Sequence, residues 1–208
     1  MSFLSALFYD KCMKATEDAC LTEWRKDLLK NVDGKVLEIG AGTGVSLDLY
    51  PKRQTLEIFL SEPDANMRSQ LEKKVHDHDL TNVTVLSCPG EKITNEDNFY
   101  DVVFVSLVCC SVNDVESSLK EIKRVLKPDG RFLFLEHVAA KSGSNLRKWQ
   151  NRLTIFWRKI AGNCHLNRET EKHIENAGFT LCEIKHERMR TVMFLVRPTI
   201  RGVAKPNK

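Results

Sequence analysis

The chain has 208 residues, of which 42% are hydrophobic and 29% charged, and its formal net charge is +4. This length and composition indicate one globular domain and exclude a disordered or fibrous chain. No apolar run approaches the ~18 residues that a membrane-spanning helix needs, and residues 1–8 have neither the basic start nor the cleavage site of a signal peptide, so we expect a cytoplasmic protein.

The first thirty residues carry apolar side chains at helical spacing, which predicts two helices that end at the turn over 31–34. The next run predicts a buried strand over 35–39, which stops at Gly40-Ala41-Gly42-Thr43-Gly44. Glycines at this density are found where the backbone turns tightly or lies close to a ligand. A strand, a glycine-rich turn and a helix form the first unit of nucleotide-binding α/β folds, and we expect this helix to begin near Val45 and to end before Pro51. The alternative for the glycines is a tight turn without a ligand.

A second strand is predicted over 56–61, and an acidic residue, Glu62, follows it 18 residues beyond Gly44. An acidic residue at the tip of the second strand is where folds of this class bind a ribose diol, because one carboxylate accepts hydrogen bonds from both hydroxyls. Pro63 suits the first turn of a helix, which we expect over 64–76. The alternative role for Glu62 and Asp64 is to cap that helix.

The remaining apolar runs predict a continued alternation of strands and helices. The strands are expected over 83–86, 101–107, 131–137, 179–186 and 192–197, and the helices over 115–125, 146–160 and 168–177, with a polar tail over 201–208 that frays. This order predicts a doubly wound α/β fold with a mostly parallel sheet, helices on both faces and a late hairpin-like pair of strands. We divide the single domain into an N-terminal helical lid (1–30), a ligand-binding core (35–137), a helical substrate cap (141–177), and the last strands and tail (178–208).

Seven cysteines are scattered along the chain, at positions 12, 20, 88, 109, 110, 164 and 182, without a Cys-x-x-Cys pair. An odd and scattered set favours reduced thiols in a reducing compartment. No spacing typical of metal ligands is present, so we expect no metal site. The neighbouring Cys109 and Cys110 are expected to pack as small hydrophobic side chains; arsenic or metal binding by this pair is the alternative.

Five segments occur in a known order over residues 35–137: VLEIGAGTG, SEPDANM, PGEKI, FYDVVFVSL, and VLKPDG followed by RFLFLEH. Together they resemble the class I methyltransferases that depend on S-adenosylmethionine (SAM), whose Rossmann-like sheet has seven strands with an antiparallel last strand. Further segments, among them LVCCSV, LEHVAA and NCHLNRE, resemble the methyltransferase-like proteins that act as alkyl-thiol S-methyltransferases, over most of the chain from Val36 onward. Human members of that family carry an apolar membrane-anchoring segment at the N-terminus, which residues 1–8 do not match.

The resemblance implies a SAM site along the strand ends. It places the methionine and ribose parts of SAM against Gly40, Ala41, Gly42 and Gly44, the amino group or a bound water at Glu38, and the ribose hydroxyls at Glu62. It also implies that Pro63 and Met67 touch the adenine or ribose face, that Gly90 and Glu91 lie at the adenine edge, and that Ser106 and Leu107 lie beside the transferred methyl. Many relatives have an aspartate two residues before that glutamate, where this chain has Pro89, so backbone groups are expected to bind the adenine.

Methyl transfer from SAM requires alignment of the donor with a nucleophile, a proximity effect worth up to ~7–11 kcal/mol. A thiol acceptor must also lose its proton, because the thiolate is the nucleophile. Glu136 and His137, at the end of the fifth strand, are the candidate catalytic residues, since an imidazole suits proton transfer near neutral pH. The alternative is a structural histidine at a strand end. His165 is a weaker candidate, Cys164 is expected to be buried rather than reactive, and Tyr9 is a candidate to close over SAM.

Basic residues concentrate in the second half of the sequence, and the stretch from His137 to Arg168 contains no acidic residue. Its apolar residues recur at helical spacing: Leu146, Trp149, Leu153, Phe156, Trp157 and Ile160. Lysines and arginines surround them, so the basic 141–160 segment is a candidate lid over an apolar pocket and a candidate for peripheral contact with an anionic membrane surface. The alternative is an ordinary amphipathic helix docked on the core.

The sequence therefore predicts an enzyme that transfers a methyl group from SAM to a small-molecule acceptor, with a thiol as the first choice. The alternatives are an O- or N-methyltransferase acting on a small metabolite, arsenite as the acceptor, and a SAM-binding regulatory protein without turnover. Nucleic acid is not an expected partner, because the basic segment has no recognised binding motif. The sequence leaves the oligomeric state open.

Overall fold

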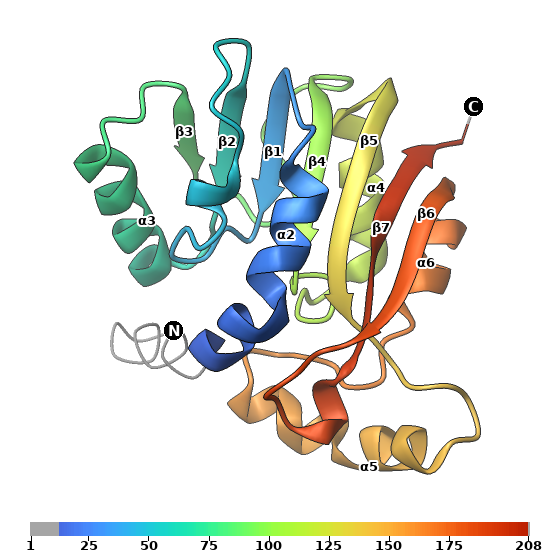
Figure 1. Cartoon of the computed structure of the whole chain (residues 1–208). Helices are drawn as coiled ribbons and strands as arrows, with labels where there is room; N and C mark the ends of the chain where they lie inside the picture. The colour runs from blue at the N-terminus through green and yellow to red at the C-terminus, as the bar shows by residue number, and fades with distance from the viewer. Residues whose placement is uncertain (1–12, 208) are drawn as a thin grey trace.

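A seven-stranded sheet forms the centre of the protein, with its strands in the order β3-β2-β1-β4-β5-β7-β6 (Figure 1). The computed structural model describes residues 13–207. Its strands are β1 (Lys35–Ile39), β2 (Glu57–Ser61), β3 (Val83–Leu86), β4 (Tyr100–Ser106), β5 (Leu126–His137), β6 (Phe179–Arg188) and β7 (Pro198–Pro206). The first five pair in parallel, whereas β7 runs antiparallel to both of its neighbours, β5 and β6. The predicted doubly wound, mostly parallel sheet with an antiparallel last strand is confirmed.

Helices cover both faces of this sheet. They are the π-helix η1 (Glu17–Leu21), α2 (Thr22–Leu29), the 3₁₀ turn η2 (Leu47–Leu49), α3 (Ala65–Asp77), α4 (Val115–Val125), α5 (Asn145–Ile160), α6 (Thr170–Asn176) and the 3₁₀ turn η3 (Phe194–Val196). Helices α2 and α3 lie over one face and α4 and α6 over the other, while α5 lies beyond the carboxyl ends of the parallel strands (Figure 1). Within residues 13–207, every helix is too short or too polar to cross a bilayer. The expected N-terminal helix before residue 13, with Tyr9, lies outside the described residues.

Two aspartates determine where the helices after β2 and β4 begin. Asp64 accepts hydrogen bonds from the backbone N–H groups of Asn66 and Met67, and Asp114 caps α4 in the same way. Such caps satisfy amide groups that no helical carbonyl reaches, and each contributes ~1 kcal/mol. The capping role considered for Asp64 is therefore confirmed, and both helices start directly beside the strand ends.

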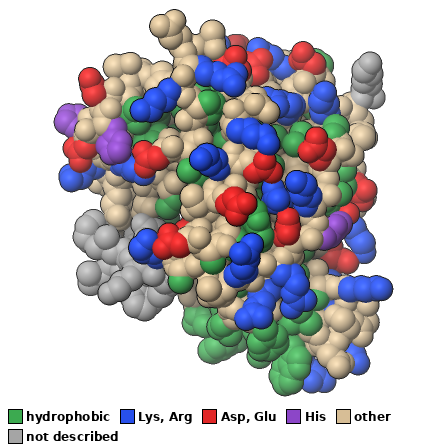
Figure 2. Space-filling model, viewed as in Figure 1, with side chains coloured by type: hydrophobic (Ala, Val, Ile, Leu, Met, Phe, Trp, Pro, Cys, Tyr) green, Lys and Arg blue, Asp and Glu red, His purple; other side chains and the backbone are tan. Residues whose placement is uncertain are grey.

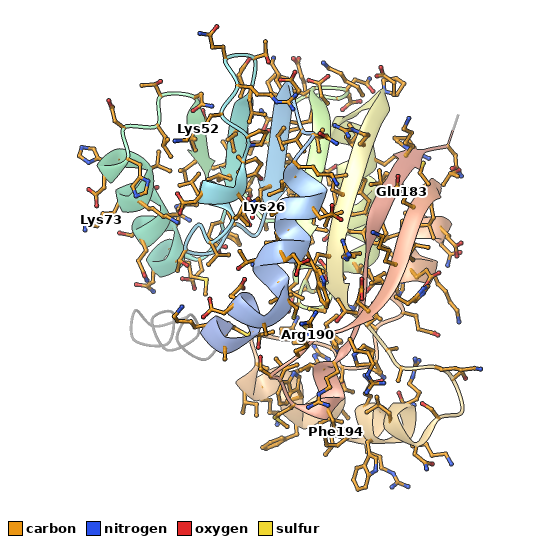
Figure 3. All side chains as sticks on the ribbon, in the orientation of Figure 1. Lys26, Lys52, Lys73, Glu183, Arg190 and Phe194 are labelled. Atoms are coloured by element: carbon orange, nitrogen blue, oxygen red, sulfur yellow. The ribbon has the colours of Figure 1, made fainter. Side chains whose placement is uncertain are left out.

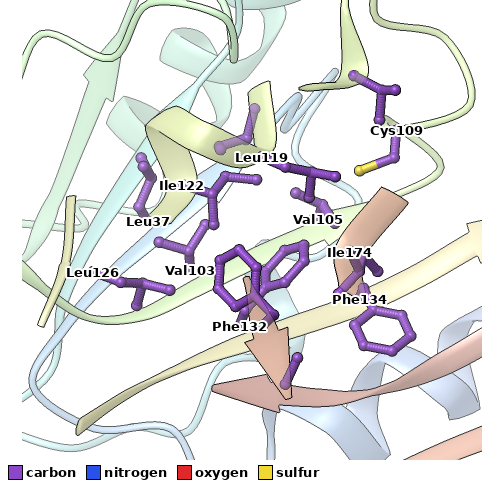
Figure 4. Close-up of a cluster of buried hydrophobic side chains, with 14 of the residues drawn as sticks. Leu37, Val103, Val105, Cys109, Leu119, Ile122, Leu126, Phe132, Phe134 and Ile174 are labelled. Atoms are coloured by element: carbon purple, nitrogen blue, oxygen red, sulfur yellow. The ribbon is translucent and has the colours of Figure 1, made fainter. Parts of the chain in front are cut away.

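The middle strands carry apolar residues on both sides because both faces of the sheet are covered. In β4, Val103 packs in the cluster that contains residues of α4 and α6, whereas Phe104 packs in the cluster that contains residues of α2 and α3. Figure 4 shows the first of these clusters, which also holds Phe134 of β5 and Ile174 of α6. Removing a buried phenylalanine side chain from such a cluster costs ~3–5 kcal/mol, so the core firmly fixes the strands whose ends carry the site.

The prediction of a helix that begins near Val45 and ends before Pro51 is wrong, because only the 3₁₀ turn η2 forms there. Tyr50 has extended backbone angles, with φ −67° and ψ 140°. A residue before proline is pushed out of the helical region by the proline ring, so the backbone leaves helical geometry at Tyr50. The residues between the glycine turn and Tyr50 are too few for a longer helix and form the single short turn η2.

The last strand is also misplaced in the prediction. The residues expected as a strand over 192–197 form a loop and η3. The strand β7 begins at Pro198 and includes residues 201–206, which were assigned to the fraying tail. This strand lies inside the sheet, where space is narrow: a Cβ added to Gly202 would meet the carbonyl oxygen of Glu183 at 2.0 Å and the ring of Phe134 at 2.9 Å. Small residues allow β7 to fit between β5 and β6, but they give it a weak apolar pattern.

Candidate functional site

The glycine turn after β1 is tied to the end of β2. The backbone N–H groups of Gly40 and Ala41 both donate to the carbonyl oxygen of Ser61, at 2.8 and 3.0 Å. Gly42 follows with a φ of +58°, a conformation that strains residues with a Cβ. A Cβ added to Gly42 would meet no atom of residues 13–207 within 4 Å. The backbone and the open space at Gly42 therefore fit a ligand that lies against the main chain.

Glu62 joins this turn to the start of α3. One carboxylate oxygen accepts a hydrogen bond from the backbone N–H of Gly42, and the other accepts one from the N–H of Asp64, each at 2.9 Å. Burial raises the pKa of Glu62, although these two N–H groups lower it. A carboxylate offers about four lone-pair positions, so about two remain for further donors such as the hydroxyls of a diol.

Two buried ionisable side chains, Glu38 and Arg25, lie beside the glycine turn. The sequence indicated Glu38 as a site residue but not Arg25. The carboxylate of Glu38 accepts a hydrogen bond from the hydroxyl of Tyr50 at 2.8 Å, and burial raises the pKa of Glu38. Arg25 of α2 is only 3% exposed, donates from Nε to the hydroxyl of Ser106 at 2.8 Å, and forms an ion pair with Glu17. Arg25 stands four residues after Leu21 on the buried side of the helix, so helical spacing could have identified it.

The loop after β3 brings Gly90 and Glu91 to the same edge of the sheet. A Cβ on Gly90 would lie 3.1 Å from a methyl group of Ile39 in β1. Glu91 accepts a hydrogen bond from the backbone N–H of Asn113 at 3.0 Å, which ties this loop to the one that follows β4. Of the two residues expected at the adenine or ribose face, Met67 is buried in the first turn of α3 and Pro63 is exposed.

The loop after β4 is built around the carboxylate of Glu136. Leu107 turns the chain with a φ of +59°, and three consecutive backbone N–H groups then point at Glu136: those of Val108, Cys109 and Cys110, at 2.9, 3.0 and 3.2 Å. Successive N–H groups of this kind form an anion-binding concavity, which Glu136 itself fills. Burial raises the pKa of Glu136 to about 7, although the three N–H groups lower it. The geometry thus gives Glu136 a positioning role toward this loop.

A cluster of sulfur and imidazole lies at the ends of β4 and β5. The ligand-forming atoms of Cys110, His137 and Cys164 all lie within 4.8 Å of one another, and Nδ1 of His137 is 3.6 Å from Sγ of Cys164. The neighbouring Cys164 raises the pKa of the Cys110 thiol, and Cys110 in turn lowers the pKa of Cys164. Cys164 is half-buried rather than buried as expected. We call these three residues the Cys-His-Cys cluster.

Arg168 holds the backbone around this cluster. Its guanidinium donates to the carbonyl oxygens of Cys109 and Val112, at 2.5 and 2.9 Å. His165 contacts the carbonyl oxygen of Cys110 and the guanidinium of Arg168, and burial lowers the pKa of His165. These contacts occupy both ring nitrogens of His165, so the structure favours His137 over His165 as the chemically available histidine.

The predicted residues converge because the parallel strands end at one edge of the sheet, which is the lower edge in Figure 1. The glycine turn and the loop after β4 are in contact, since a Cβ on Gly40 would lie 2.5 Å from a methyl group of Val108. The turn therefore lies between Glu62 on one side and the loop that carries Cys110 on the other. The sequence patterns did not indicate Arg25 or Arg168, nor that the three members of the Cys-His-Cys cluster meet.

The chain matches a family model described as a methyltransferase domain over residues 37–134. It is 34% identical to the human thiol S-methyltransferase TMT1A over 171 residues, which cover 81% of this chain and 69% of that protein. It is also 34% identical to the thiol S-methyltransferase TMT1B of Rattus norvegicus over 208 residues, which cover 98% of this chain and 83% of that protein. Its fold is similar to the crystal structure of a SAM-dependent methyltransferase from Aquifex aeolicus, with a TM-score of 0.67, 16% identity and 98% of both chains covered.

Proposed function

This chain belongs to the thiol S-methyltransferase family of class I SAM-dependent methyltransferases, and we propose that it transfers the methyl group of SAM to a small thiol. The extent of the similarity carries the choice of acceptor. Identity to TMT1B continues over 98% of the chain, well beyond the methyltransferase core at residues 37–134. Segments outside a shared core are where proteins of one fold differ in the molecules they bind, so similarity there supports a shared acceptor class.

The turn after β1 and the residues around it would hold the cofactor. The free lone pairs of Glu62 suit the ribose hydroxyls, and Gly42 lets its backbone approach the ligand. Glu38, Pro63, Met67, Gly90, Glu91, Ser106 and Leu107 complete the proposed SAM contacts, with Gly40, Ala41 and Gly44. SAM, when bound, supplies a methyl group that its sulfonium has already activated, so the chain needs to align the acceptor and assist loss of its proton.

His137, at the end of β5, is the side chain that could assist the acceptor thiol in losing its proton. A thiol must be a thiolate to act as a nucleophile, and thiolate formation at neutral pH needs a base or a cation nearby. Both carboxylate oxygens of Glu136 are already bonded to backbone N–H groups, whereas His137 is 2% exposed and close to two sulfur atoms. We therefore propose that thiolate formation depends on His137.

Methyl transfer from labelled SAM to a panel of acceptors tests this function. The panel contains an alkyl thiol, hydrogen sulfide, a phenol, an amine and arsenite. We expect transfer to thiols and loss of most of that activity in His137→Ala, while His186→Ala, at an exposed histidine paired with Glu171, keeps it. Transfer to the phenol, amine or arsenite alone would contradict the thiol assignment, and SAM binding without any transfer would support a regulatory protein instead.

We further propose that α5 and η3 rest on an anionic membrane surface. The outer side of α5 exposes Ile155, Phe156 and Ile160 at 70%, 64% and 63%, and η3 adds the half-exposed Phe194. Figure 2 shows hydrophobic side chains gathered at the lower end of the molecule, over the position of α5 in Figure 1, and Figure 3 labels Phe194 at the same end. The exposed Arg152 and Lys159 flank this apolar face, which is the composition of a helix that lies in a lipid interface.

Vesicle pelleting tests the membrane contact. We expect the protein to pellet with vesicles that contain phosphatidylserine, and to do so less when Phe156→Ser removes apolar area or Arg152→Glu reverses a charge. Lys73→Glu on α3 makes the same charge change on an exposed helix elsewhere and is expected to leave pelleting unchanged. Equal amounts of unbound protein with anionic and with neutral vesicles would rule out this contact, and the protein would then be expected to act in the cytoplasm without a lipid surface.

A further inference from the structure

The Cys-His-Cys cluster has the composition of a metal site. It combines two thiols and one imidazole, the ligand types that Zn²⁺ prefers, and Cys110 and His137 are 3% and 2% exposed. The residues come from three separate segments: the loop after β4, the end of β5 and the loop after α5. This is why no ligand spacing in the sequence indicated it.

The distances suit a tetrahedral ion. Bonds of ~2.3 Å to sulfur and ~2.0–2.1 Å to nitrogen place a sulfur and a nitrogen ligand about 3.6 Å apart around such an ion. Nδ1 of His137 and Sγ of Cys164 are 3.6 Å apart, and all three ligand atoms lie within 4.8 Å of one another. A divalent ion with two thiolates and a neutral imidazole is uncharged overall, which suits a buried position.

Nδ1 is the ring nitrogen of His137 that lies beside Cys164, which leaves Nε2 as the second nitrogen of the ring. This Nε2 is buried and has no hydrogen-bond partner among residues 13–207. A buried polar atom without a partner costs ~1–3 kcal/mol, so native structures nearly always provide one. With Nδ1 bound to a metal, Nε2 would carry the proton of the neutral imidazole and would donate it to a bound water or ligand.

We propose that Cys110, His137 and Cys164 bind one Zn²⁺ ion and leave its fourth position for the acceptor thiol. Three protein ligands and an open position are the pattern of catalytic zinc, whereas structural zinc has four protein ligands. The half-buried Cys164 leaves this side of the cluster partly accessible. An incoming thiol gives its proton to water as its sulfur bonds to the metal, and the sulfur keeps a lone pair for the methyl group. The use of the fourth position rests on the proposed thiol S-methyltransferase function.

Cobalt substitution tests the site without SAM and without turnover. Reduced, metal-free protein is titrated with Co²⁺, and the near-ultraviolet thiolate-to-cobalt band and the visible bands of tetrahedral cobalt are recorded. We expect saturation at one equivalent, loss of about half of the thiolate band in Cys110→Ser and in Cys164→Ser, and at least tenfold weaker binding in each. Cys109→Ala, next to the cluster, and Cys182→Ser, at an exposed thiol, are the controls and are expected to match the wild type.

A second measurement needs no variant and therefore survives a variant that does not fold. Zn²⁺ is expected to protect Cys110 and Cys164 of the wild-type protein from alkylation, as read by mass spectrometry, while Cys182 reacts equally with and without the metal. Wild-type protein with free thiols that binds neither Co²⁺ nor Zn²⁺ overturns the proposal, as does a thiolate band that Cys110→Ser and Cys164→Ser leave intact. A disulfide between Cys110 and Cys164 that persists in reductant also overturns it.

The open position is tested by adding a small alkyl thiol to the cobalt protein. We expect a stronger thiolate band, with no such change on addition of the corresponding alcohol. An unchanged band overturns the assignment of the fourth position to the acceptor. Thiol methylation by metal-free protein would overturn the metal's role but leave the proposed function standing. Metal binding without thiol methylation would overturn the proposed function but leave the metal site standing.

Discussion

Replacing Glu62 by glutamine tests the cofactor site most directly. The side chain keeps its length and most of its shape but loses its charge and one of its two acceptor oxygens. In the structure, the two oxygens face the backbone N–H groups of Gly42 and Asp64. The amide group of glutamine must therefore turn its NH₂ toward one of these donors, and only one oxygen is left for a ribose hydroxyl.

The expected loss follows from the number of hydrogen bonds. A hydrogen bond to a charged group contributes ~1.5–3 kcal/mol, and Glu62→Gln removes one such bond to the ribose and makes the other one neutral. We expect SAM binding to weaken by ~2–3 kcal/mol, which is roughly 30- to 150-fold in Kd. Glu62→Asp keeps the charge but withdraws it by one methylene group, so its Kd is expected to lie between those of the wild type and Glu62→Gln.

Isothermal titration calorimetry with SAM measures the change, and thermal unfolding checks that the variant is folded. Glu57→Gln, at the exposed start of β2, is the matched control and is expected to bind SAM like the wild type. Glu62→Gln should weaken the binding of a ligand that lacks one ribose hydroxyl much less than it weakens the binding of SAM. Such a ligand already lacks one of the hydrogen bonds between the ribose and Glu62. A folded Glu62→Gln whose Kd stays within threefold of the wild-type value would refute the assignment of Glu62 to the ribose.

Three further predictions concern the stability of the fold around the site. Arg25→Ala leaves the carboxylate of Glu17 without its ion-pair partner, so urea titration should show ~3 kcal/mol less stability. The double variant Arg25→Met with Glu17→Gln should recover most of this loss, and no recovery would contradict the pairing. Burial holds the pKa of Glu38 above its ordinary value of 4.5, so the folded state binds this proton more tightly than the unfolded chain. The free energy of unfolding should therefore decrease as the pH rises above 4.5. In urea titrations over a pH series, this decrease should be smaller for Glu38→Gln than for the wild type. An equal decrease in both proteins would exclude Glu38 as the cause of the pH dependence. Gly202→Ala places a Cβ against the carbonyl of Glu183 and should cost ~3 kcal/mol or more. Gly143→Ala meets no described atom within 4 Å and should cost only the ~1–2 kcal/mol of its positive φ, so equal losses would contradict the packing argument.

The sequence predicted those elements whose patterns are local. The strand at 35–39 and the helix at 115–125 are present with the expected limits, because a buried parallel strand is apolar throughout and an amphipathic helix repeats its apolar residues. β7 was not predicted because its position between β5 and β6, rather than a hydrophobic pattern, buries it. Small residues such as Gly202 and Ala204 fit in this position. A pattern of side-chain hydrophobicity carries little information about such a strand.

The same distinction holds for the site. The glycine turn and Glu62 were found because backbone geometry and a short spacing impose their residue types. The Cys-His-Cys cluster could not be found in this way, since Cys110, His137 and Cys164 are separated by 27 residues in each interval and meet only after β4, β5 and α5 are in place. The role of Glu136 was also hidden, because its three partners are backbone groups that any residue offers.

The position of β7 affects how the protein can fail to fold. β7 follows β6 in the chain but lies between β5 and β6, so β6 cannot join the sheet until the segment after it has paired. A defect in β7 would therefore leave two strands with unsatisfied hydrogen-bonding edges, and one of them, β5, has an almost wholly buried and apolar central run. Unpaired edges of this kind template association with other chains. Variants in β7 are thus more prone to aggregate than variants of equal stability loss in β3, which already forms the opposite edge of the sheet.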